Sequence, residues 1–394
     1  MPVNSTKYIR KFIACIVLLV AISTPLHAQV KNKGHLLQII FTSDAHYGIT
    51  RKTFRGQTDV SGHAVNAAMI EKINTLPNTY LPADTGLNAG NITGHIDYII
   101  EGGDIANRME IPNQSAAASW AQFDTDYIKG IHLNGQYGRQ AKLLIIPGNH
   151  DISNAIGFYR PMNPLTNPTS LVNIYNLMLK PVKPLTNSTY NYATTKINYS
   201  KNIGRIHVMF ITLWPDSAER KWMEKDLAKI STTTPVIIFS HDQPESEAKH
   251  FTNPNPGHTI NGGDKFENLL SEVYKDGTNI NMEAGTTEFE QRGLVKFIKK
   301  HPNIKAYFHG NANFNEFYVY HGPDHDIALN IFRADSPMKG RYSSQDERKL
   351  SFQLITIDSK KCRMTVRECL WNTDPTHPEK PLQWGSSKTI SLLR

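Results

Sequence analysis

The sequence is poor in cysteine, which limits both disulfide bonding and thiol chemistry. Only three cysteines occur in 394 residues, and one of them, Cys15, lies in a short apolar stretch near the N-terminus. The odd spacing of Cys362 and Cys369 would place them on opposite faces of one strand, so a disulfide between them would need an intervening turn. We therefore expect structural thiols, or one bridge in an oxidising compartment, and no cysteine nucleophile.

The N-terminal region also lacks a hydrophobic run long enough to span a membrane. The apolar stretch Phe12–Ile22 has about ten residues, whereas a spanning helix needs ~20. It follows three cations among residues 7–11 and precedes Leu26-His27-Ala28, where a small residue offers a cleavage site. We predict a signal peptide over residues 1–28 and a periplasmic or secreted protein with no membrane span after cleavage. An uncleaved membrane anchor is the alternative.

A dense run of lysine and arginine is absent as well. The formal net charge of +8 falls to +5 without the three cations of the predicted signal peptide. This mild excess suits anionic substrates such as phosphate esters, although solvated surface charge is the simpler explanation, and no segment indicates a nucleic-acid track. With 39% hydrophobic and 20% charged residues, the composition is that of a globular protein and excludes a disordered or fibrous one.

What the sequence does contain is an apolar run that ends abruptly in polar residues, the motif LLIIPGNHD. Leu143–Ile146 has no solvent-facing position among its apolar residues, which predicts a buried strand of a parallel or mixed sheet. Gly148 then permits a tight turn. Because ligands bind beyond the carboxyl ends of strands in open α/β sheets, we expect Asn149, His150 and Asp151 at a binding site.

Four further strand-like runs have the same arrangement. Each is apolar and each ends in Asp, His or Asn: Leu37–Phe41 before Asp44 and His46, Ile96–Ile100 before Asp104, Pro235–Phe239 before His241, and Ile304–Phe308 before Asn311 and Asn313. One such residue at a strand exit is common by chance, whereas five exits in this order are not. We therefore expect the exits to converge at one edge of the sheet and to hold metal ions.

The order of these motifs, DxH, GD, GNHD, H and a glycine followed by two spaced polar residues, resembles the calcineurin-like metallophosphoesterases. The resemblance covers roughly Leu37 to Trp371. It implies an α/β fold in which two mixed β-sheets pack face to face and are flanked by helices. We expect one catalytic domain over residues 29–394, with insertions near 77–94, 157–200 and 245–290.

The resemblance also implies two divalent cations and assigns their ligands. The first site would use Asp44, His46, Asp104 and Asn313, and the second would use Asp104, Asn149, His241 and Asn311. Where the family has Gly-His-x-His, this chain has the sequence Gly310-Asn311-Ala312-Asn313. Carboxamide oxygens favour harder ions, so we expect manganese or magnesium before iron or zinc. His309, His321 or His325 could replace a missing ligand, although strand geometry would point His309 elsewhere.

The remaining site residues concern the substrate. By the same resemblance, His150 would protonate the departing alkoxide, and Asp151 would orient that ring and keep it charged. Arg108 occupies a phosphate-gripping position, with an ordinary surface arginine as an equal alternative. The chain is thus expected to hydrolyse phosphate mono- or diesters of small molecules. The alternative is a non-catalytic phosphate- or nucleotide-binding protein on the same scaffold, with weakened or lost metal sites.

Hydrophobic periodicity predicts the elements between and after the strand exits. We expect helices at Ala64–Leu76, Ser115–Ile131, Leu171–Leu179 and Ala218–Ile230, and strands at Arg205–Leu213, Ser351–Ile357 and Met364–Leu370. The segment Pro77–Gly94 is expected to be an irregular loop on the substrate rim. The Pro-rich tail after Trp371 is expected on the surface.

Overall fold

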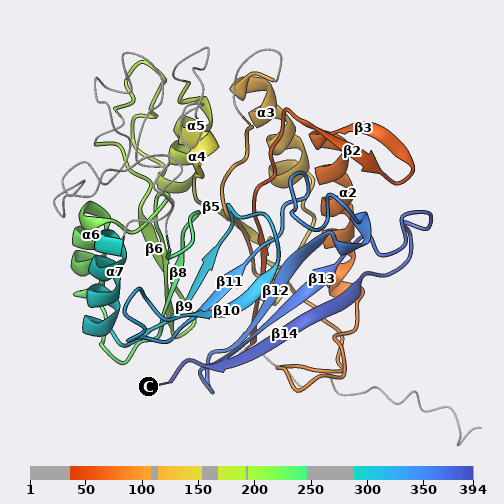
Figure 1. The fold of residues 1–394 in the computed structure, drawn as a ribbon. Coiled ribbons are helices and arrows are strands. Elements are labelled where there is room, and N and C mark those ends of the chain that lie inside the picture. Colours follow the sequence, from red (N-terminus) through yellow and green to blue (C-terminus); the bar gives the residue numbers. More distant parts are fainter. Residues whose placement is uncertain (1–35, 108–113, 153–166, 192–193, 246–287, 394) are drawn as a thin grey trace, which may run out of the picture. The chain divides into compact units, whose positions relative to one another are not determined.

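The computed structural model of the protein (Figure 1) describes residues 36–107, 114–152, 167–191, 194–245 and 288–393. Two six-stranded sheets pack face to face, and helices cover their outer faces. This arrangement of layers confirms the predicted α/β fold with two mixed sheets. The predicted signal peptide lies outside the described residues.

The first sheet has the strand order β14-β13-β12-β1-β4-β5. Its strands are β1 (Leu36–Thr42), β4 (Tyr98–Glu101), β5 (Lys142–Ile145), β12 (Ser351–Asp358), β13 (Arg363–Leu370) and β14 (Gln383–Ser391). β1, β4 and β5 run parallel, whereas β12, β13 and β14 pair antiparallel. Phe41, Ile100 and Leu144 are register partners, so the three parallel strands end at the same level.

The second sheet has the strand order β10-β11-β9-β8-β7-β6. Its strands are β6 (Tyr199–Ile203), β7 (Ile206–Phe210), β8 (Val236–Phe239), β9 (Ile304–His309), β10 (Glu316–Tyr320) and β11 (Leu329–Arg333). The four central strands run parallel, and the two edge strands pair antiparallel. This sheet therefore also delivers several carboxyl ends to one edge.

Phenylalanines fill the space between the sheets directly below the strand exits. Consecutive rings on the four parallel strands of the second sheet stack with centroids 4.7–5.5 Å apart, in the order Phe210, Phe239, Phe308 and Phe332. Phe41 of β1 meets this row edge-on, 5.4 Å from Phe239 and 5.6 Å from Phe308. Since the polar exits follow these rings within a few residues, the packing holds the exits of both sheets together.

Helices form the two outer layers. On the first sheet lie α2 (Gly62–Thr75), α3 (Ala116–Phe123) and α5 (Thr169–Leu179), and on the second lie α6 (Ser217–Leu227) and α7 (Glu288–Lys300). A short helix, α4 (Asn149–Ile152), follows β5. The predicted helices are confirmed, except that α3 continues after Phe123 as a π-helical turn, Asp124–Lys129. The sequence-based prediction missed α7.

The tail after Trp371 is more ordered than expected. Its residues Gln383–Ser391 form β14, an edge strand that pairs with β13. The strand is largely exposed and polar, so no hydrophobic alternation marks it in the sequence. The hairpin of β2 (Thr50–Phe54) and β3 (Gln57–Ser61) was missed for the same reason. The predicted hairpin of β12 and β13 is confirmed.

The placement of Pro77–Gly94 on the substrate rim is wrong. This loop covers β13 on the face of the first sheet that carries the helices. Arg367 of β13 donates to both oxygens of Asp84 at 2.8 Å, and the N–H of Leu87 donates to Thr365 Oγ1 at 2.9 Å. The loop therefore closes over a buried arginine of the sheet instead of lining the strand exits. The other two predicted insertions lie partly or almost wholly outside the described residues.

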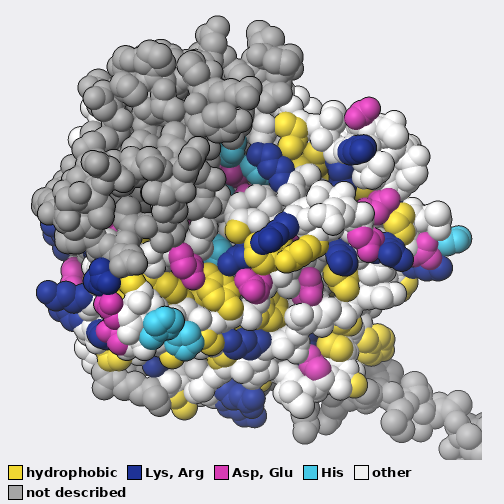
Figure 2. Space-filling model, in the orientation of Figure 1, with side chains coloured by type: hydrophobic (Ala, Val, Ile, Leu, Met, Phe, Trp, Pro, Cys, Tyr) yellow, Lys and Arg dark blue, Asp and Glu magenta, His cyan; other side chains and the backbone are white. Residues whose placement is uncertain are grey.

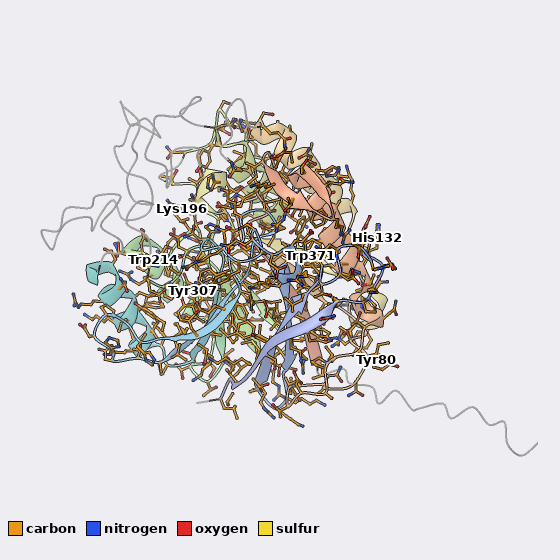
Figure 3. All side chains as sticks on the ribbon, turned by 45° about the vertical axis from the view of Figure 1, so that its right-hand side comes forward. Tyr80, His132, Lys196, Trp214, Tyr307 and Trp371 are labelled. Atoms are coloured by element: carbon orange, nitrogen blue, oxygen red, sulfur yellow. The ribbon has the colours of Figure 1, made fainter. Side chains whose placement is uncertain are left out.

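The described surface carries mixed charges. Figure 2 shows lysine and arginine side chains interspersed with acidic and hydrophobic ones on the visible face. Cys362 and Cys369 are free thiols. Across the described ranges, no helix is both long enough and apolar enough to cross a bilayer. Tyr80 and His132 are exposed, and Figure 3 shows both on the side of the molecule away from Lys196 and Trp214.

Candidate metal centre

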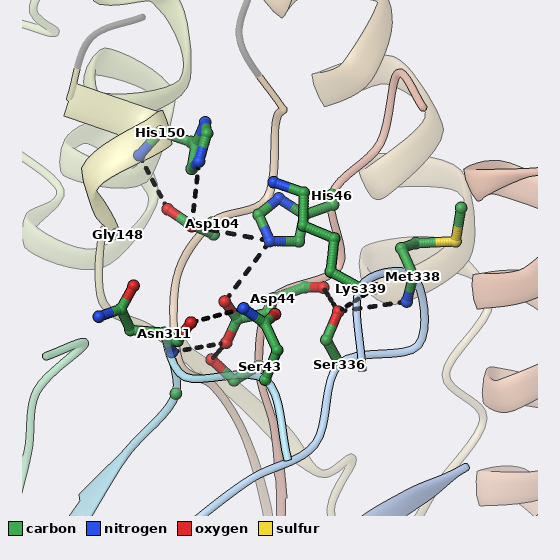
Figure 4. A network of polar contacts seen from close by, with 12 residues as sticks. Ser43, Asp44, His46, Asp104, Gly148, His150, Asn311, Ser336, Met338 and Lys339 are labelled. Atoms are coloured by element: carbon green, nitrogen blue, oxygen red, sulfur yellow. Dashed lines mark hydrogen bonds and ion pairs between the residues drawn. The ribbon is translucent and has the colours of Figure 1, made fainter. Parts of the chain in front are cut away.

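The polar strand exits converge at one edge of the two sheets. Ligand atoms lie within 4.8 Å of one another in two overlapping groups, which are His46 with Asp104 and His150, and Asp44 with Asp104 and His241. All five side chains are buried. Figure 4 shows Asp104 between His150 and His46. The structure therefore brings together residues that the sequence separates by nearly two hundred positions.

Asp104 is the centre of this arrangement. Its Oδ2 lies 3.4 Å from His241 Nε2, 3.7 Å from His46 Nε2 and 3.8 Å from His150 Nε2. Its Oδ1 accepts the backbone N–H of His150 at 2.8 Å, which fixes the orientation of the carboxylate. One oxygen is thus held by the backbone and the other faces three imidazoles.

Asp44 is held in the same way, with one carboxylate oxygen in hydrogen bonds and the other facing an imidazole. Its Oδ2 accepts the hydroxyl of Ser43 at 2.6 Å and the backbone N–H of Asn311 at 2.9 Å. Its Oδ1 lies 3.5 Å from His46 Nε2. The hydrogen bond from Asn311 joins the exit of β9 to that of β1, so both sheets position this carboxylate.

His241 is oriented by a backbone carbonyl. Its Nδ1 lies 2.7 Å from the oxygen of Gly102, and because a carbonyl can only accept, Nδ1 carries the proton. Nε2 then faces Asp104 and the centre, where a bound cation would take the place of its proton. This is the usual arrangement of a metal-binding histidine, in which the outer nitrogen is tied by a hydrogen bond.

The candidate ligands sit on unusual backbone. Five of them have φ between 45° and 60°, namely Asp44, His46, Asp104, Asn311 and Asn313. Residues other than glycine rarely adopt this left-handed region, although Asp, Asn and His tolerate it better than most. Such strain accumulates where surrounding structure holds side chains in a functional geometry.

Two glycines allow the loops to approach closely. A Cβ at Gly148 would meet the carboxylate of Asp104 and lie 2.8 Å from His241 Cε1, and one at Gly310 would meet Ser43 and Asp44. Neither position has room for a side chain. Gly148 and Gly310 therefore allow the strand exits of the two sheets to come into contact.

Burial and charge act in opposite directions on the ionisable groups. Burial would raise the pKa of Asp104, but three imidazoles, led by His241, outweigh it and hold this pKa well below the usual range. Burial would lower the pKa of His241, yet Asp104 and then Asp44 raise it well above its ordinary value. For His46, burial and the ammonium of Lys339 dominate and lower the pKa. A neutral His46 has a lone pair for a cation.

The donor set fits divalent cations. Four buried ligand atoms have no hydrogen-bond partner among the described residues: Asp44 Oδ1, His46 Nε2, His241 Nε2 and Asn313 Oδ1. Buried polar atoms are normally satisfied, so such a cluster needs an explanation. Two ligands that are each ~2.1 Å from a tetrahedral ion lie roughly 3.4 Å apart. The separations of 3.4–3.8 Å around Asp104 are close to that value.

The predicted role of Asp151 needs correction. Its carboxylate accepts the backbone N–H groups of Gly148 at 3.0 Å, Asp104 at 2.8 Å, Ile105 at 3.1 Å and Ala106 at 3.3 Å. Burial, together with the charge of Asp104, raises the pKa of Asp151 to about 7. The side chain ties the exit of β4 to that of β5, because its oxygens serve the backbone. We reassign it from orienting His150 to positioning these two loops.

The two asparagines that replace the family's histidines differ from each other. Asn313 donates its Nδ2 to the carbonyl of Asn311 at 2.5 Å, which leaves Oδ1 available as a ligand. Asn311 donates its Nδ2 to Gln243 Oε1 at 3.1 Å. The structure thus favours Asn313 as a metal ligand and directs the amide nitrogen of Asn311 toward the exit of β8.

The candidate replacement histidines lie elsewhere. His309 contacts the carbonyl of Gly310 at 2.9 Å and the hydroxyl of Tyr318 at 3.3 Å, which confirms that strand geometry points it away. His321 contacts the carbonyl of Ile327 in the loop after β10. None of the three, including His325, belongs to either group of ligand atoms found among the described residues.

Two predicted site residues remain, Arg108 and Asn149. Arg108 lies outside the described residues. Asn149 is buried at the start of α4, between Gly148 and His150, which both contact Asp104. Its ligand role stays a prediction.

Sequence reasoning missed a supporting segment that comes from far along the chain. Ser336 donates its hydroxyl to the carbonyl of Asp44 at 2.8 Å and accepts the N–H of Lys339 at 2.9 Å. Figure 4 places the Lys339 side chain beside His46. No strand-exit motif marks Ser336 or Lys339, because they lie in the loop between β11 and β12.

Comparisons with known proteins agree with this geometry. The family model described as calcineurin-like phosphoesterase matches residues 37–327. A dimetal phosphatase from Danio rerio is similar in structure, with a TM-score of 0.51 and 7% identity over 90% of this chain and 99% of that one. At this identity, the similarity concerns the fold alone. No curated protein matches the sequence.

Two other solved structures align over most of their length. The calcineurin-like phosphoesterase YfkN from Bacillus subtilis is 11% identical over 91% of both chains, with a TM-score of 0.32. The phosphopantetheinyl hydrolase PptH from Mycobacterium tuberculosis is 11% identical over 80% of this chain and 94% of that one, with a TM-score of 0.35. Both TM-scores are too low to add to the comparison.

Proposed function

This chain belongs to the calcineurin-like phosphoesterase family, and on that premise we propose that it hydrolyses phosphate mono- or diesters of small molecules with two divalent metal ions. The observation that carries the proposal is the position of Asp104 Oδ2, which faces three imidazole nitrogens at 3.4–3.8 Å. A carboxylate in that position can serve both cations. Manganese or magnesium is the proposed metal, because two carboxamides replace the family's imidazoles.

The residues that would hold the metals come from both sheets. Asp104 would be shared, with Asp44, His46 and Asn313 on one side and Asn149 and His241 on the other. When bound, such ions would lower the pKa of a water molecule and offset the negative charge of the phosphate. The protein fixes the metal ligands in advance through the hydrogen bonds that Ser43 and the backbone N–H of His150 donate and the one that the Gly102 carbonyl accepts.

His150 is the proposed proton donor. Its Nε2 lies 3.8 Å from Asp104 Oδ2, and its backbone N–H is fixed by the other oxygen of the same carboxylate. An imidazolium in this position can deliver a proton to the departing alkoxide. A leaving group that is already a weak base needs this proton less, so the contribution of His150 depends on the leaving group.

The experiment is a hydrolysis assay with metal-depleted protein that is reloaded with manganese, magnesium, iron or zinc. We expect turnover of phosphate esters, and His150→Gln should lower kcat by about 10²–10⁴ for an alkyl ester and less for a nitrophenyl ester. His132→Gln is the matched control, because this exposed histidine lies away from the site (Figure 3). Absence of turnover with every ion would overturn the proposal.

A non-catalytic binding protein is the second candidate. The two carboxamides of Asn311 and Asn313 favour it, because they stand where the family has metal-binding imidazoles and are weaker donors to such ions. Metal analysis separates the two candidates. Two ions for each chain support the enzyme, and none supports a phosphate- or nucleotide-binding protein.

We also propose a periplasmic or secreted location, which rests on the first 28 residues of the sequence. Cleavage after Ala28 would remove the three N-terminal cations. N-terminal sequencing of protein recovered from the periplasm or the medium should then begin at Gln29. Recovery of full-length chain from the cytoplasm would contradict this location.

A further inference from the structure

Two aromatic rings with three flanking cations lie beside the candidate metal centre. Two of these cations are Arg333, whose guanidinium carbon lies 4.1 Å from the Phe314 ring centroid, and Lys349, whose Nζ lies 5.8 Å from the Tyr342 ring centroid. The rings of Phe314 and Tyr342 are 5.5 Å apart and nearly perpendicular, at 76°. The guanidinium carbon of Arg341 lies 5.4 Å from the first ring centroid and 5.6 Å from the second. Tyr342 is 47% exposed, and Arg341 is exposed as well. Among the described residues, Arg341 has no acidic partner within ion-pair distance.

The backbone joins this aromatic cluster to the ligands. Phe314 follows Asn313 in the chain, and the backbone N–H of Arg341 donates to the carbonyl of Asn313 at 2.6 Å. The same loop reaches Asp44 through the hydroxyl of Ser336. The turn at Asn313 and the loop from Ser336 to Tyr342 therefore carry both the aromatic cluster and contacts to the metal ligands. A substrate held by the metals could also reach the aromatic cluster.

The loop between β11 and β12, which carries Arg341 and Tyr342, is held in place by Arg51 of β2. Arg51 of β2 donates to the carbonyls of Pro337, at 3.0 Å, and of Ser343. A Cβ at Gly340 would meet the side chains of Asp335 and Ser343, so the turn is tightly packed. Arg341 and Tyr342 are thus exposed shortly after the buried stretch 334–338 of this loop. Ordering such a platform for a ligand requires little additional loss of entropy.

We propose that Phe314, Arg341 and Tyr342 bind the leaving group of the substrate, and that this group is planar and aromatic. The inference rests on the proposed phosphoesterase function and specifies its substrate class. Aromatic faces stack on planar rings, and a guanidinium plane does the same while it adds positive charge beside a phosphate. The base of a nucleoside phosphate and a simple aryl group share this chemistry. An aliphatic leaving group gains nothing from it.

The test compares three substrates on manganese-loaded protein, adenosine monophosphate, nitrophenyl phosphate and glycerol phosphate. We expect Tyr342→Ala to raise KM about tenfold for the planar leaving groups, in line with the loss of one stacking contact. KM for glycerol phosphate should not change, and Tyr342→Phe should retain the wild-type values. An effect on the adenosine ester alone assigns the cluster to a nucleobase, and an effect on both assigns it to any aryl group.

The control is Tyr80→Ala, since Tyr80 is 69% exposed and its carbonyl accepts the indole N–H of Trp384 of β14, outside the loop that carries the cluster. Equal losses for all three substrates, or no loss for any, would overturn the inference. Calorimetric binding of adenosine monophosphate to manganese-loaded His150→Gln protein, with and without Tyr342→Ala, does not require turnover. If the wild type hydrolyses nothing, the proposed function fails, while a tenfold weaker affinity in the double variant still supports the aromatic cluster.

Discussion

The exits of the first sheet and those of the second contribute different chemistry to the same centre. β1, β4 and β5 deliver Asp44, His46, Asp104 and His150, a set rich in charge and imidazole. β8 and β9 deliver one imidazole, His241, and the two carboxamides of Asn311 and Asn313. The first half of the centre, from β1, β4 and β5, thus has the family's charged and imidazole side chains. The second half, from β8 and β9, has two neutral carboxamides where the family has imidazoles.

The two halves also differ in how they are held. In the first, Asp151 accepts four backbone N–H groups and fastens the exits of β4 and β5 together. In the second, separate hydrogen bonds join the exits of β8 and β9, from the N–H of Gly310 to the carbonyl of His241 and from Asn311 to Gln243. The comparison suggests that the first half fixes the geometry, whereas the second half sets which metal is preferred and how tightly it binds.

The largest expected effect comes from the residue that both halves share. Asp104→Asn should lower kcat/KM by about a thousandfold or more, since bound metals contribute several kcal/mol to such reactions. Metal content measured by elemental analysis should fall as well, because the amide loses the charge that offsets two cations. Asp59→Asn, at an exposed position, is the control. Retention of full metal content would show that Asp104 is not the shared ligand.

A smaller effect, on stability, is expected when the hydrogen bonds that join the exits of β4 and β5 are removed. Asp151→Asn replaces one accepting oxygen by an NH₂ group, so buried N–H groups of the β4 loop lose their acceptor. The free energy of unfolding should fall by about 2–3 kcal/mol, as measured by urea denaturation. The matched change in the second half, Gln243→Ala, should have a lesser effect on stability, because it removes one bond to Asn311. Equal losses would contradict the difference between the halves.

Much of the first half could be predicted from the sequence. Buried parallel strands appear as uninterrupted apolar runs, and the residues that follow such runs must lie at one edge of the sheet. This reasoning brings Asp44, Asp104 and His241 to a common edge, which is where the structure has them. The same reasoning misjudged Asp151, because a carboxylate beside a catalytic imidazole and one that binds backbone N–H groups look alike in a sequence.

What the sequence could not show depends on contacts between distant segments. Ser336 reaches Asp44 across nearly three hundred residues, and neither has a spacing that indicates the other. β14 is half exposed, and its polar residues hide the alternation of an edge strand. The loop at Pro77–Gly94 has the composition of a substrate rim, yet the buried Arg367 draws it to the outer face of β13 through Asp84.

The smallest expected effect is a change in metal preference when the family's two imidazoles are restored to the second half. It is also the sharpest test of the difference between the halves. The double variant Asn311→His/Asn313→His should bind zinc at least about tenfold more tightly, as imidazole is a better donor to such ions than a carboxamide. Its preference for manganese over zinc should fall correspondingly in competition titrations followed by activity. The buried Oδ1 of Asn313 has no hydrogen-bond partner among the described residues and the structure favours it as a ligand, so Asn313→His alone should produce most of the gain. If neither variant changes the metal preference, the two asparagines do not contact the metals, and the centre is built by the other exits alone.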